Sequence, residues 1–510
     1  MDTEIELKFL VSSDVGSRLP ALLQSYNIRQ HDQQHLANTY FDTADLALGS
    51  IKAGLRIRSQ NGKMEQTVKL AGSQVGGLHQ RPEHNVPLTV HSPDLFLFPE
   101  HIWPEQFNVN LVQQSLQPLF STDFLRQRWL LTIEDTDIEL ALDSGEVQAG
   151  EQRETIHELE LELVKGDVSQ LFELADDLVK AGGLRLGAIS KAQRGYRLAG
   201  FSAPPRLQML EPLPLAATDN CEQTMMALLH KGLSHWQHHE EGWLAEPGDR
   251  LEWLMQLREG VSLVHQTLLL FGNQVSHHVN SGWIDDLLWL QQQLSWLDRA
   301  QMLAYLTADK GHYLRRLDCQ KSVLGQLQAQ QQQLPDEAQL EALFYSARYG
   351  RLMLGLTHWL YRQDWRAGLA ASQTVQLAAP VGELARQRLE DSWHILRNSA
   401  LGEPTLDGER YIQQKGKLRR NLMIGLCFST LYPEADRIGF RMPWLDILRG
   451  IEDLDMLSPL QEVSEQLDAT EAAELEQWLA RKQQFLLEAL EQSRTQALLM
   501  KPYWQSFTSR

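Results

Sequence analysis

The first 200 residues contain short segments in which charged and apolar residues alternate, and this pattern constrains the fold most. The opening segment EIELKF would place Glu4, Glu6 and Lys8 on one face of an extended strand and apolar side chains on the other. The same two-residue period recurs in LRIRS, EQTVKLA, IELALDSGEV and HELELELV. A period of two is typical of β-strands, so the N-terminal region is predicted to be rich in antiparallel sheet.

The charges on these faces are grouped by sign, unlike the mixed charges of an ordinary soluble surface. One such face alone is typical of the solvated side of a sheet. Taken together they favour the interior of an eight-stranded barrel, which has room for side chains or one small ligand. The basic residues predicted to face inward are Lys8, Arg56, Arg58, Lys69, Arg81, Arg126 and Arg128, and the acidic ones are Glu4, Glu6, Glu65, Glu83, Glu139, Asp143, Glu158, Glu160 and Glu162.

Such an interior suits a polyanion that carries a metal ion. Glutamates two residues apart on a strand point the same way and can share a hard cation such as Mg²⁺ or Mn²⁺. Arginines two residues apart can bind phosphate oxygens with both guanidinium groups. The sequence contains no P-loop, no nucleophile elbow and no HExxH zinc helix. The barrel interior is therefore the predicted site of the chemistry.

The second half of the chain has a different pattern, and the whole is predicted to be an α+β protein. Helices are expected near Val15–Tyr26 and Ser169–Ala181 within the barrel region, and apolar residues recur at helical spacing from about residue 219 to the end. Four prolines between residues 200 and 219 indicate an extended linker. The predicted organisation is a barrel domain at 1–200, a linker at 201–218 and an all-α bundle at 219–510.

Composition and charge exclude several classes of protein. No apolar run approaches the roughly 18 residues of a membrane helix. The acidic start MDTEIELKF does not resemble a signal peptide, and the three cysteines form no CxxC pair, so a reduced cytoplasmic protein is expected. The net charge of -19 disfavours a general nucleic-acid binder, because phosphate would be repelled.

A resemblance to a known family extends over residues 1 to about 200. The ExExK pattern at Glu4–Lys8 resembles the signature of the CYTH domain, found in the triphosphate tunnel metalloenzymes. Further matching motifs follow in order: TYFDT, GLRIR, TVKL, GLHQRPE, ALDSGEV, ELELEL and SKAQRGY. The resemblance implies an eight-stranded tunnel that holds inorganic triphosphate with two divalent metal ions, Mg²⁺ or Mn²⁺. The expected reaction is hydrolysis to pyrophosphate and phosphate, as in an inorganic triphosphatase.

The resemblance also implies roles for individual residues. The expected catalytic residues are Lys8, Lys69, Glu160 and Lys191. The expected substrate-binding residues are Arg56, Arg58, Arg81, Arg126, Arg128 and Arg194. The expected metal ligands are Glu4, Glu6, Asp143, Glu158, Glu160 and Glu162.

The helical half is similar to a CHAD domain whose basic residues are depleted. In the stretch from Trp253 to Phe271, Met255 stands where the family has histidine, and Arg258 remains of the basic row. The stretch Lys415–Asn421 keeps several bases. A polyphosphate or protein partner is expected to bind through this half. The half would support a purely polyphosphate-binding function only if residues 415–420 and Arg258 converge on one surface.

Alternative functions remain at the level of sequence. The same tunnel could act on thiamine triphosphate or a nucleoside triphosphate, or cyclise ATP. A non-catalytic polyphosphate-binding or targeting protein is a further alternative. The full set of inward carboxylates argues against it, because a simple polyanion binder would gain affinity by losing them.

Overall fold

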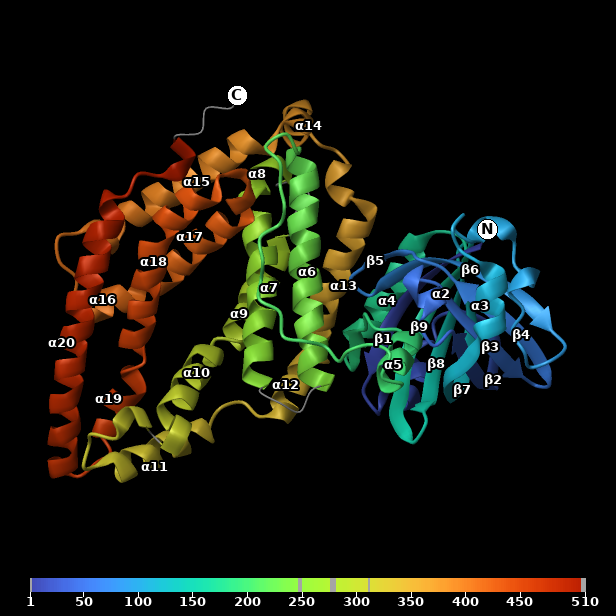
Figure 1. Ribbon diagram of the computed structural model, residues 1–510, viewed down its shortest axis with the longest axis horizontal. Coiled ribbons are helices and arrows are strands. Elements are labelled where there is room, and N and C mark those ends of the chain that lie inside the picture. Colours follow the sequence, from blue (N-terminus) through green and yellow to red (C-terminus); the bar gives the residue numbers. More distant parts are fainter. Residues whose placement is uncertain (1, 246–249, 276–280, 311, 506–510) are drawn as a thin grey trace. The chain divides into compact units, whose positions relative to one another are not determined.

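The structure is a computed structural model that describes residues 2–245, 250–275, 281–310 and 312–505. Its contacts divide the chain into two compact units: the first contains the blue-to-green barrel of Figure 1 and residues 337–364, and the second contains the other helices. The first unit comprises Met1–Arg206 and Glu337–Asp364, and the second comprises Leu207–Asp336 and Trp365–Arg510.

Eight antiparallel strands of the first unit close into a barrel. In order around it they are β1 (Asp2–Val11), β9 (Gln152–Lys165), β8 (Thr136–Ala149), β7 (Gln117–Ile133), β2 (Asn27–Asp42), β3 (Gly54–Gln60), β4 (Lys63–Lys69) and β6 (Leu78–Leu88). The barrel closes because β1 pairs with β6 as well as with β9. Two short strands, β5 (Ser73–Val75) and β10 (Leu184–Leu186), pair with β6 and β1. The predicted eight-stranded antiparallel barrel is confirmed.

The apolar side chains of the barrel face outward and are covered by helices. On β1, Leu7 and Phe9 are fully buried, whereas Glu6 and Lys8 line the interior. Helix α4 (Val168–Lys180) packs on β1 and β9 through an apolar stripe. Helix α1 (Val15–Leu22) and α3 (Val109–Ser115) also bury apolar residues. The predicted helices at 15–26 and 169–181 correspond to α1 and α4; α1 starts as predicted and ends four residues earlier, and both ends of α4 are shifted by one residue.

Helix α5 (Lys191–Leu198) places a basic residue in the barrel interior. Ser190 and Gln193 form a capping box that fixes the start of the helix, and Lys191 is its first residue. The helix packs closely on β7, because a Cβ atom at Gly195 would lie 2.0 Å from the Phe120 ring. The cap and this contact together hold the Lys191 side chain against the interior carboxylates.

Two helices from the middle of the chain belong to the barrel unit. They are α12 (Glu337–Phe344) and α13 (Ala347–Arg362), and α13 packs against α4 and β10. Gly350 permits this approach, since a Cβ atom there would lie 2.6 Å from Val179 Cγ1. The His358 and Phe172 rings stack with centroids 4.2 Å apart. The domain bounds at residues 200 and 219 stay a prediction.

The second unit is formed by helices. Its first two long helices, α6 (Cys221–Ala245) and α7 (Arg250–Leu270), approach each other closely at Gly232 and Gly260, where a Cβ atom would lie 2.7 Å from Val264 and from Trp236 respectively. No described helix has both the length and the apolar character needed to span a membrane. The α-helices of this unit are α6 (Cys221–Ala245), α7 (Arg250–Leu270), α8 (Gly272–Val275), α9 (Ser281–Gln293), α10 (Trp296–Thr307), α11 (Gln320–Gln331), α14 (Ala371–Ala378), α15 (Val381–Arg397), α16 (Gly408–Gln413), α17 (Lys415–Cys427), α18 (Glu434–Asp455), α19 (Ser458–Ser464) and α20 (Ala469–Leu499).

Candidate active site in the barrel

A cavity of about 790 Å³ lies inside the barrel, and all eight strands contribute to its wall. Alternation along each strand turns every second side chain inward, as the sequence pattern predicts. The charged lining residues are Glu4, Glu6, Lys8, Lys52, Arg56, Arg58, Glu65, Lys69, Arg81, Glu83, Arg126, Glu139, Glu160, Glu162 and Lys191. The cavity therefore contains many charges of both signs at close range.

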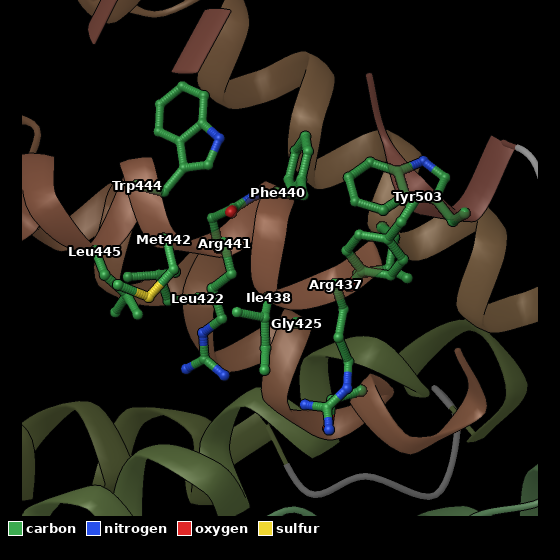
Figure 2. Close-up of a pocket in the computed structure, with 14 residues that line it drawn as sticks. Leu422, Gly425, Arg437, Ile438, Phe440, Arg441, Met442, Trp444, Leu445 and Tyr503 are labelled. Carbon is green, nitrogen blue, oxygen red and sulfur yellow. The ribbon is translucent and has the colours of Figure 1, made fainter. Parts of the chain in front are cut away.

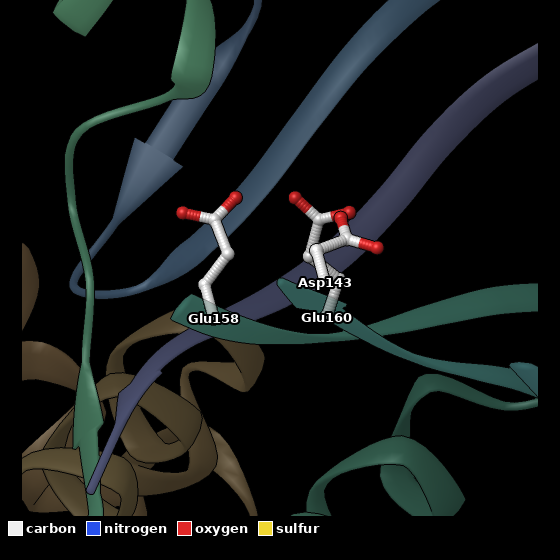
Figure 3. A group of neighbouring side chains, drawn as sticks. All are labelled: Asp143, Glu158 and Glu160. Atoms are coloured by element: carbon white, nitrogen blue, oxygen red, sulfur yellow. The ribbon is translucent and has the colours of Figure 1, made fainter. Parts of the chain in front are cut away.

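Three carboxylates stand together on the neighbouring strands β8 and β9. Asp143 and Glu158 are partners in the strand register, and Glu160 is the next inward residue on β9. One oxygen atom from each lies within 4.8 Å of the others, and Figure 3 shows their side chains pointing to the same side of the strands. This spacing alone would be compatible with a metal ion.

Basic side chains already balance the charge of this triad. Lys191 Nζ lies 2.7 Å from Asp143 Oδ2 and 2.8 Å from Glu160 Oε1, and it also pairs with Glu158. Lys8 Nζ lies 2.7 Å from Glu158, and Arg126 donates two 2.8 Å hydrogen bonds to Asp143. Although burial opposes ionisation, Lys191, Arg126 and Lys8 hold the pKa of Glu160 well below its usual range.

Glu6 and Glu162, in contrast, have no basic side chain among the described residues that compensates their charge. They face each other in the β1–β9 register, and neither has an ion-pair partner in the described part of the chain. Burial raises the pKa of Glu6 to about 7, and the nearby Glu160 and Glu4 add to the effect. Burial also raises the pKa of Glu162 to about 8, with Glu4 and Glu139 contributing. A divalent cation fits here, because it would remove this repulsion.

Lys69 balances two further acids of the cavity, Glu4 and Glu83. Its Nζ atom lies 2.6 Å from Glu4 Oε2 and 2.9 Å from Glu83 Oε2. Although burial opposes ionisation, Lys69 and Arg56 lower the pKa of Glu83 to about 2. Lys69 is thus held between two carboxylates at the cavity wall.

Two arginines in the cavity lack an acidic partner within the described residues. Arg58 lies on β3, four strands from β9 around the barrel, and its Nε atom donates a 2.9 Å hydrogen bond to Asn38. Burial lowers the pKa of Arg58 to about 10, and the positive charges of Arg56 and Arg126 add to this. Arg81 contacts only the His79 ring, at 2.9 Å, among its described polar partners. Both guanidinium groups are therefore available to bind an anion.

Four of the predicted site residues do not line the cavity. Arg128 instead pairs with Asp32 at 2.8 Å. Arg194 pairs with Glu154 at 2.6 Å and reaches Glu158 at 3.4 Å. The other two are the fully buried Asp143 and Glu158, which lie behind Lys191 and Lys8.

The site also contains residues to which no role was assigned from the sequence. Glu65, Glu83 and Glu139 were recognised as inward charges without a site role, and each lines the cavity. Uncharged lining residues were missed: Asn38, Tyr40, Asn85, Phe124 and Tyr196. Asn38 and Tyr40 are two residues apart on β2 and therefore point to the same side of the strand, which could have indicated them. The sequence of β2, however, lacks a clear alternating pattern from which to recognise the strand.

Basic residues of the second unit converge, but on a carboxylate. Arg258 of α7 lies 2.8 Å from Asp298 of α10. Lys415 and Arg419 of α17 each lie 2.9 Å from the other oxygen of Asp298. Arg419 also lies 2.7 Å from Glu452 of α18. Arg258, Lys415 and Arg419 of the CHAD-like row are therefore already paired with carboxylates, whereas Lys417 and Arg420 are exposed.

Comparison with known families gives two matches along the chain. The model described as CYTH domain matches residues 2–196, and the model described as CHAD domain matches residues 227–454. An inorganic triphosphatase from Haemophilus influenzae is 39% identical over 195 residues, which are 38% of this chain and 54% of the relative. The chain thus spans about half the length of this curated relative.

Solved structures with similar parts have low sequence identity. A putative adenylyl cyclase from Hippeastrum, described as having a dominant triphosphatase activity, is 21% identical, with a TM-score of 0.30; the match covers 38% of this chain and 95% of the other. The CHAD domain from the plant Ricinus communis is 18% identical, with a TM-score of 0.42, over 60% of this chain and 98% of the other.

Proposed function

Because residues 2–196 are a CYTH domain and residues 227–454 are a CHAD domain, we propose that the chain is an inorganic triphosphatase. The reaction is metal-dependent hydrolysis of tripolyphosphate to pyrophosphate and phosphate within the barrel cavity. The activity of the Haemophilus influenzae relative supports this proposal.

One observation carries the proposal, namely that the cavity holds unbalanced charges of both signs on different strands. Glu6 and Glu162 lack basic partners among the described residues, while Arg58 and Arg81 lack acidic ones. A cation alone would satisfy the first pair, and an anion alone would satisfy the second. A divalent cation bound to a polyphosphate would satisfy both at once.

The acids without a balancing charge are the best candidates to hold metal. We assign this role to Glu6 and Glu162, with Glu4 beside them, and Mg²⁺ or Mn²⁺ as the ion. When bound, the ion would neutralise phosphate charge and lower the pKa of a water molecule. The Asp143, Glu158 and Glu160 triad is a weaker candidate, because Lys191 already contacts all three carboxylates.

The basic residues bind and orient the substrate in this proposal. Arg58 and Arg81 would take phosphate oxygens directly, and Arg56 and Arg126 would add positive charge from neighbouring positions. Lys8 and Lys191 would hold the three carboxylates of the triad in place through their ion pairs, while Lys69 would do the same for Glu4 and Glu83. Phosphoryl transfer depends mostly on such positioning and charge neutralisation. A β9 glutamate, Glu160 or Glu162, would orient the attacking water.

The experiment measures phosphate and pyrophosphate release from tripolyphosphate by the full-length chain. Reactions contain Mg²⁺, Mn²⁺ or a chelator, and ATP and thiamine triphosphate are tested as alternative substrates. We expect metal-dependent release that is fastest with tripolyphosphate. Arg58→Gln should raise KM about tenfold or more, because a charge-assisted contact to phosphate is lost.

Arg153→Gln is the matched control, since Arg153 lies on β9 with its side chain 58% exposed, outside the cavity. Its kinetic constants should equal those of the unmodified chain. Release that persists in chelator, or turnover of ATP exceeding that of tripolyphosphate, would contradict the proposed substrate and metal dependence.

A further inference from the structure

A second cavity, of about 180 Å³, lies in the helical unit (Figure 2). It is formed by α15, α17, α18 and the short 3₁₀ helix η8 (Tyr503–Gln505). Most of its wall is apolar or aromatic. The lining residues on which the argument rests are Leu422, Phe440, Trp444, Tyr503, Arg437 and Arg441. None of them belongs to the barrel site.

Two arginines enter this cavity from successive turns of α18. Figure 2 shows Arg437 and Arg441 extending in the same direction, with Ile438 between them. Arg437 has one ion pair in the described part of the chain, a 3.6 Å contact with Glu434, whose side chain is 74% exposed. Arg441 has none there. Burial lowers the pKa of Arg441, as does the nearby charge of Arg437, although Tyr503 acts in the opposite direction.

Three buried donor atoms at the cavity lack an acceptor. They are Nε of Arg437, Nε of Arg441 and Nε1 of Trp444, none of which has a hydrogen-bond partner among the described residues. Buried polar atoms in proteins are nearly always hydrogen-bonded, so each such atom needs an explanation. All three are donors, and no carboxylate of the described residues lines the wall. The group that they lack is therefore an acceptor, and the two positive charges favour an anion.

The rest of the wall sets the size and polarity of the ligand. Phe440 packs edge-to-face on Tyr503 and Trp504, with ring centroids 5.6 and 5.1 Å apart. A cavity of about 150 Å³ lined by apolar residues holds benzene in another protein, so about 180 Å³ is enough for one ring or a short branched chain. Inorganic phosphate would leave this apolar surface without contacts.

We propose that this cavity binds a small organic anion, namely a carboxylate with an aromatic ring or a branched aliphatic chain. The carboxylate accepts hydrogen bonds from Arg437 and Arg441, and the apolar body packs against Leu422, Phe440 and Trp444. The site is separate from the barrel chemistry and does not depend on it.

Binding is measured on the full-length chain by calorimetry and ligand-observed NMR. The probe is benzoate, with benzyl alcohol as its neutral counterpart and inorganic phosphate as an anion without an apolar body. We expect saturable binding of benzoate and at least tenfold weaker binding of the other two. Arg441→Gln and Arg437→Gln should each weaken benzoate binding about tenfold. Arg449→Gln is the control, because Arg449 lies on the same helix, 69% exposed and outside the cavity.

A second pair of variants tests the cavity without removing a charge. Gly425 lines it, and a Cβ atom there would meet nothing within 4 Å, so Gly425→Leu should fill the space and abolish binding. Gly439 is equally open but is not part of the wall, so Gly439→Leu should leave binding unchanged. Equal affinity for benzoate and benzyl alcohol, competition by phosphate, or unaltered binding in Arg441→Gln and Gly425→Leu would overturn the proposal.

Discussion

At the scale of single residues, the arrangement of charges in the barrel separates two groups of carboxylates that the sequence presents as one. Asp143, Glu158 and Glu160 surround the Lys191 ammonium group, whereas Glu6 and Glu162 have no basic partner in the described chain. Alternation along the strands predicted that all five would face inward. It could not predict the partners, because Lys191 approaches from a helix more than 30 residues further along the chain.

Glu6 belongs to the carboxylates without a basic partner, so the Glu6→Gln variant tests the role of that group. Triphosphate hydrolysis should fall about 100-fold or more, because the proposed metal ligand and its charge are lost. The metal-free variant should unfold at a higher temperature than the metal-free unmodified chain, since repulsion with Glu4 and Glu160 is relieved. The stabilisation that Mg²⁺ gives the unmodified chain should shrink in the variant. Thermal unfolding with and without Mg²⁺ measures both effects.

Glu151→Gln serves as the control, because Glu151 is exposed in the turn between β8 and β9. It should retain hydrolysis and the Mg²⁺-dependent shift in Tm. A Glu6→Gln protein that is both inactive and less stable without metal would place Glu6 in a structural role instead.

At the scale of elements, the strands with one alternating face were predictable and β2 was not. The first half of β2, NIRQHDQQHL, is polar on both faces and largely exposed, so it has no two-residue hydrophobic period. Its pairing with β7 along most of its length defines it as a strand. The short strands β5 and β10 are also set by their partners, since three residues contain no period to detect.

The helical elements are joined by the ion-pair cluster on Asp298, which connects α7, α10 and α17. Arg258, Lys415 and Arg419 hold the pKa of Asp298 well below its usual range, despite the opposing effect of burial. A carboxyl group whose folded-state pKa is lowered stabilises the fold above its unfolded pKa near 4, and this contribution is lost as pH falls through the folded-state value. The ion-pair cluster therefore links the three helices in a pH-dependent way.

Asp298→Asn should destabilise the helical unit by about 3 kcal/mol at pH 7, since three bases lose their shared partner. The difference from the unmodified chain should shrink as pH falls below about 4, because protonation removes the same charge from Asp298. Urea unfolding followed at several pH values gives both quantities. The exposed Asp285→Asn provides the comparison. A difference in the free energy of unfolding that stays constant down to pH 2 would show that the Asp298 ion pairs do not stabilise the helical unit.

At the scale of the whole molecule, the division of the chain does not follow its order in sequence. Residues 337–364 lie within the helical half by their pattern, yet α13 packs on α4 and β10 of the barrel unit. Its amphipathic period resembles that of its neighbours in sequence, so the pattern shows that it is a helix but not which core it joins. Specific contacts decide this, including the 2.8 Å pair between Arg351 and Asp176.

This packing predicts that α13 stabilises the barrel from outside. Gly350→Leu should cost about 1–3 kcal/mol, because a Cβ atom there would already lie 2.6 Å from Val179 Cγ1 and 3.1 Å from the Leu184 carbonyl oxygen. Hydrogen exchange should accelerate in α4 and β10, which α13 covers, and less in β7 and β8. Gly325→Leu on α11 is the matched control, since a Cβ atom there meets nothing within 4 Å. Unchanged exchange in α4 and β10 would show that the barrel does not depend on this helix.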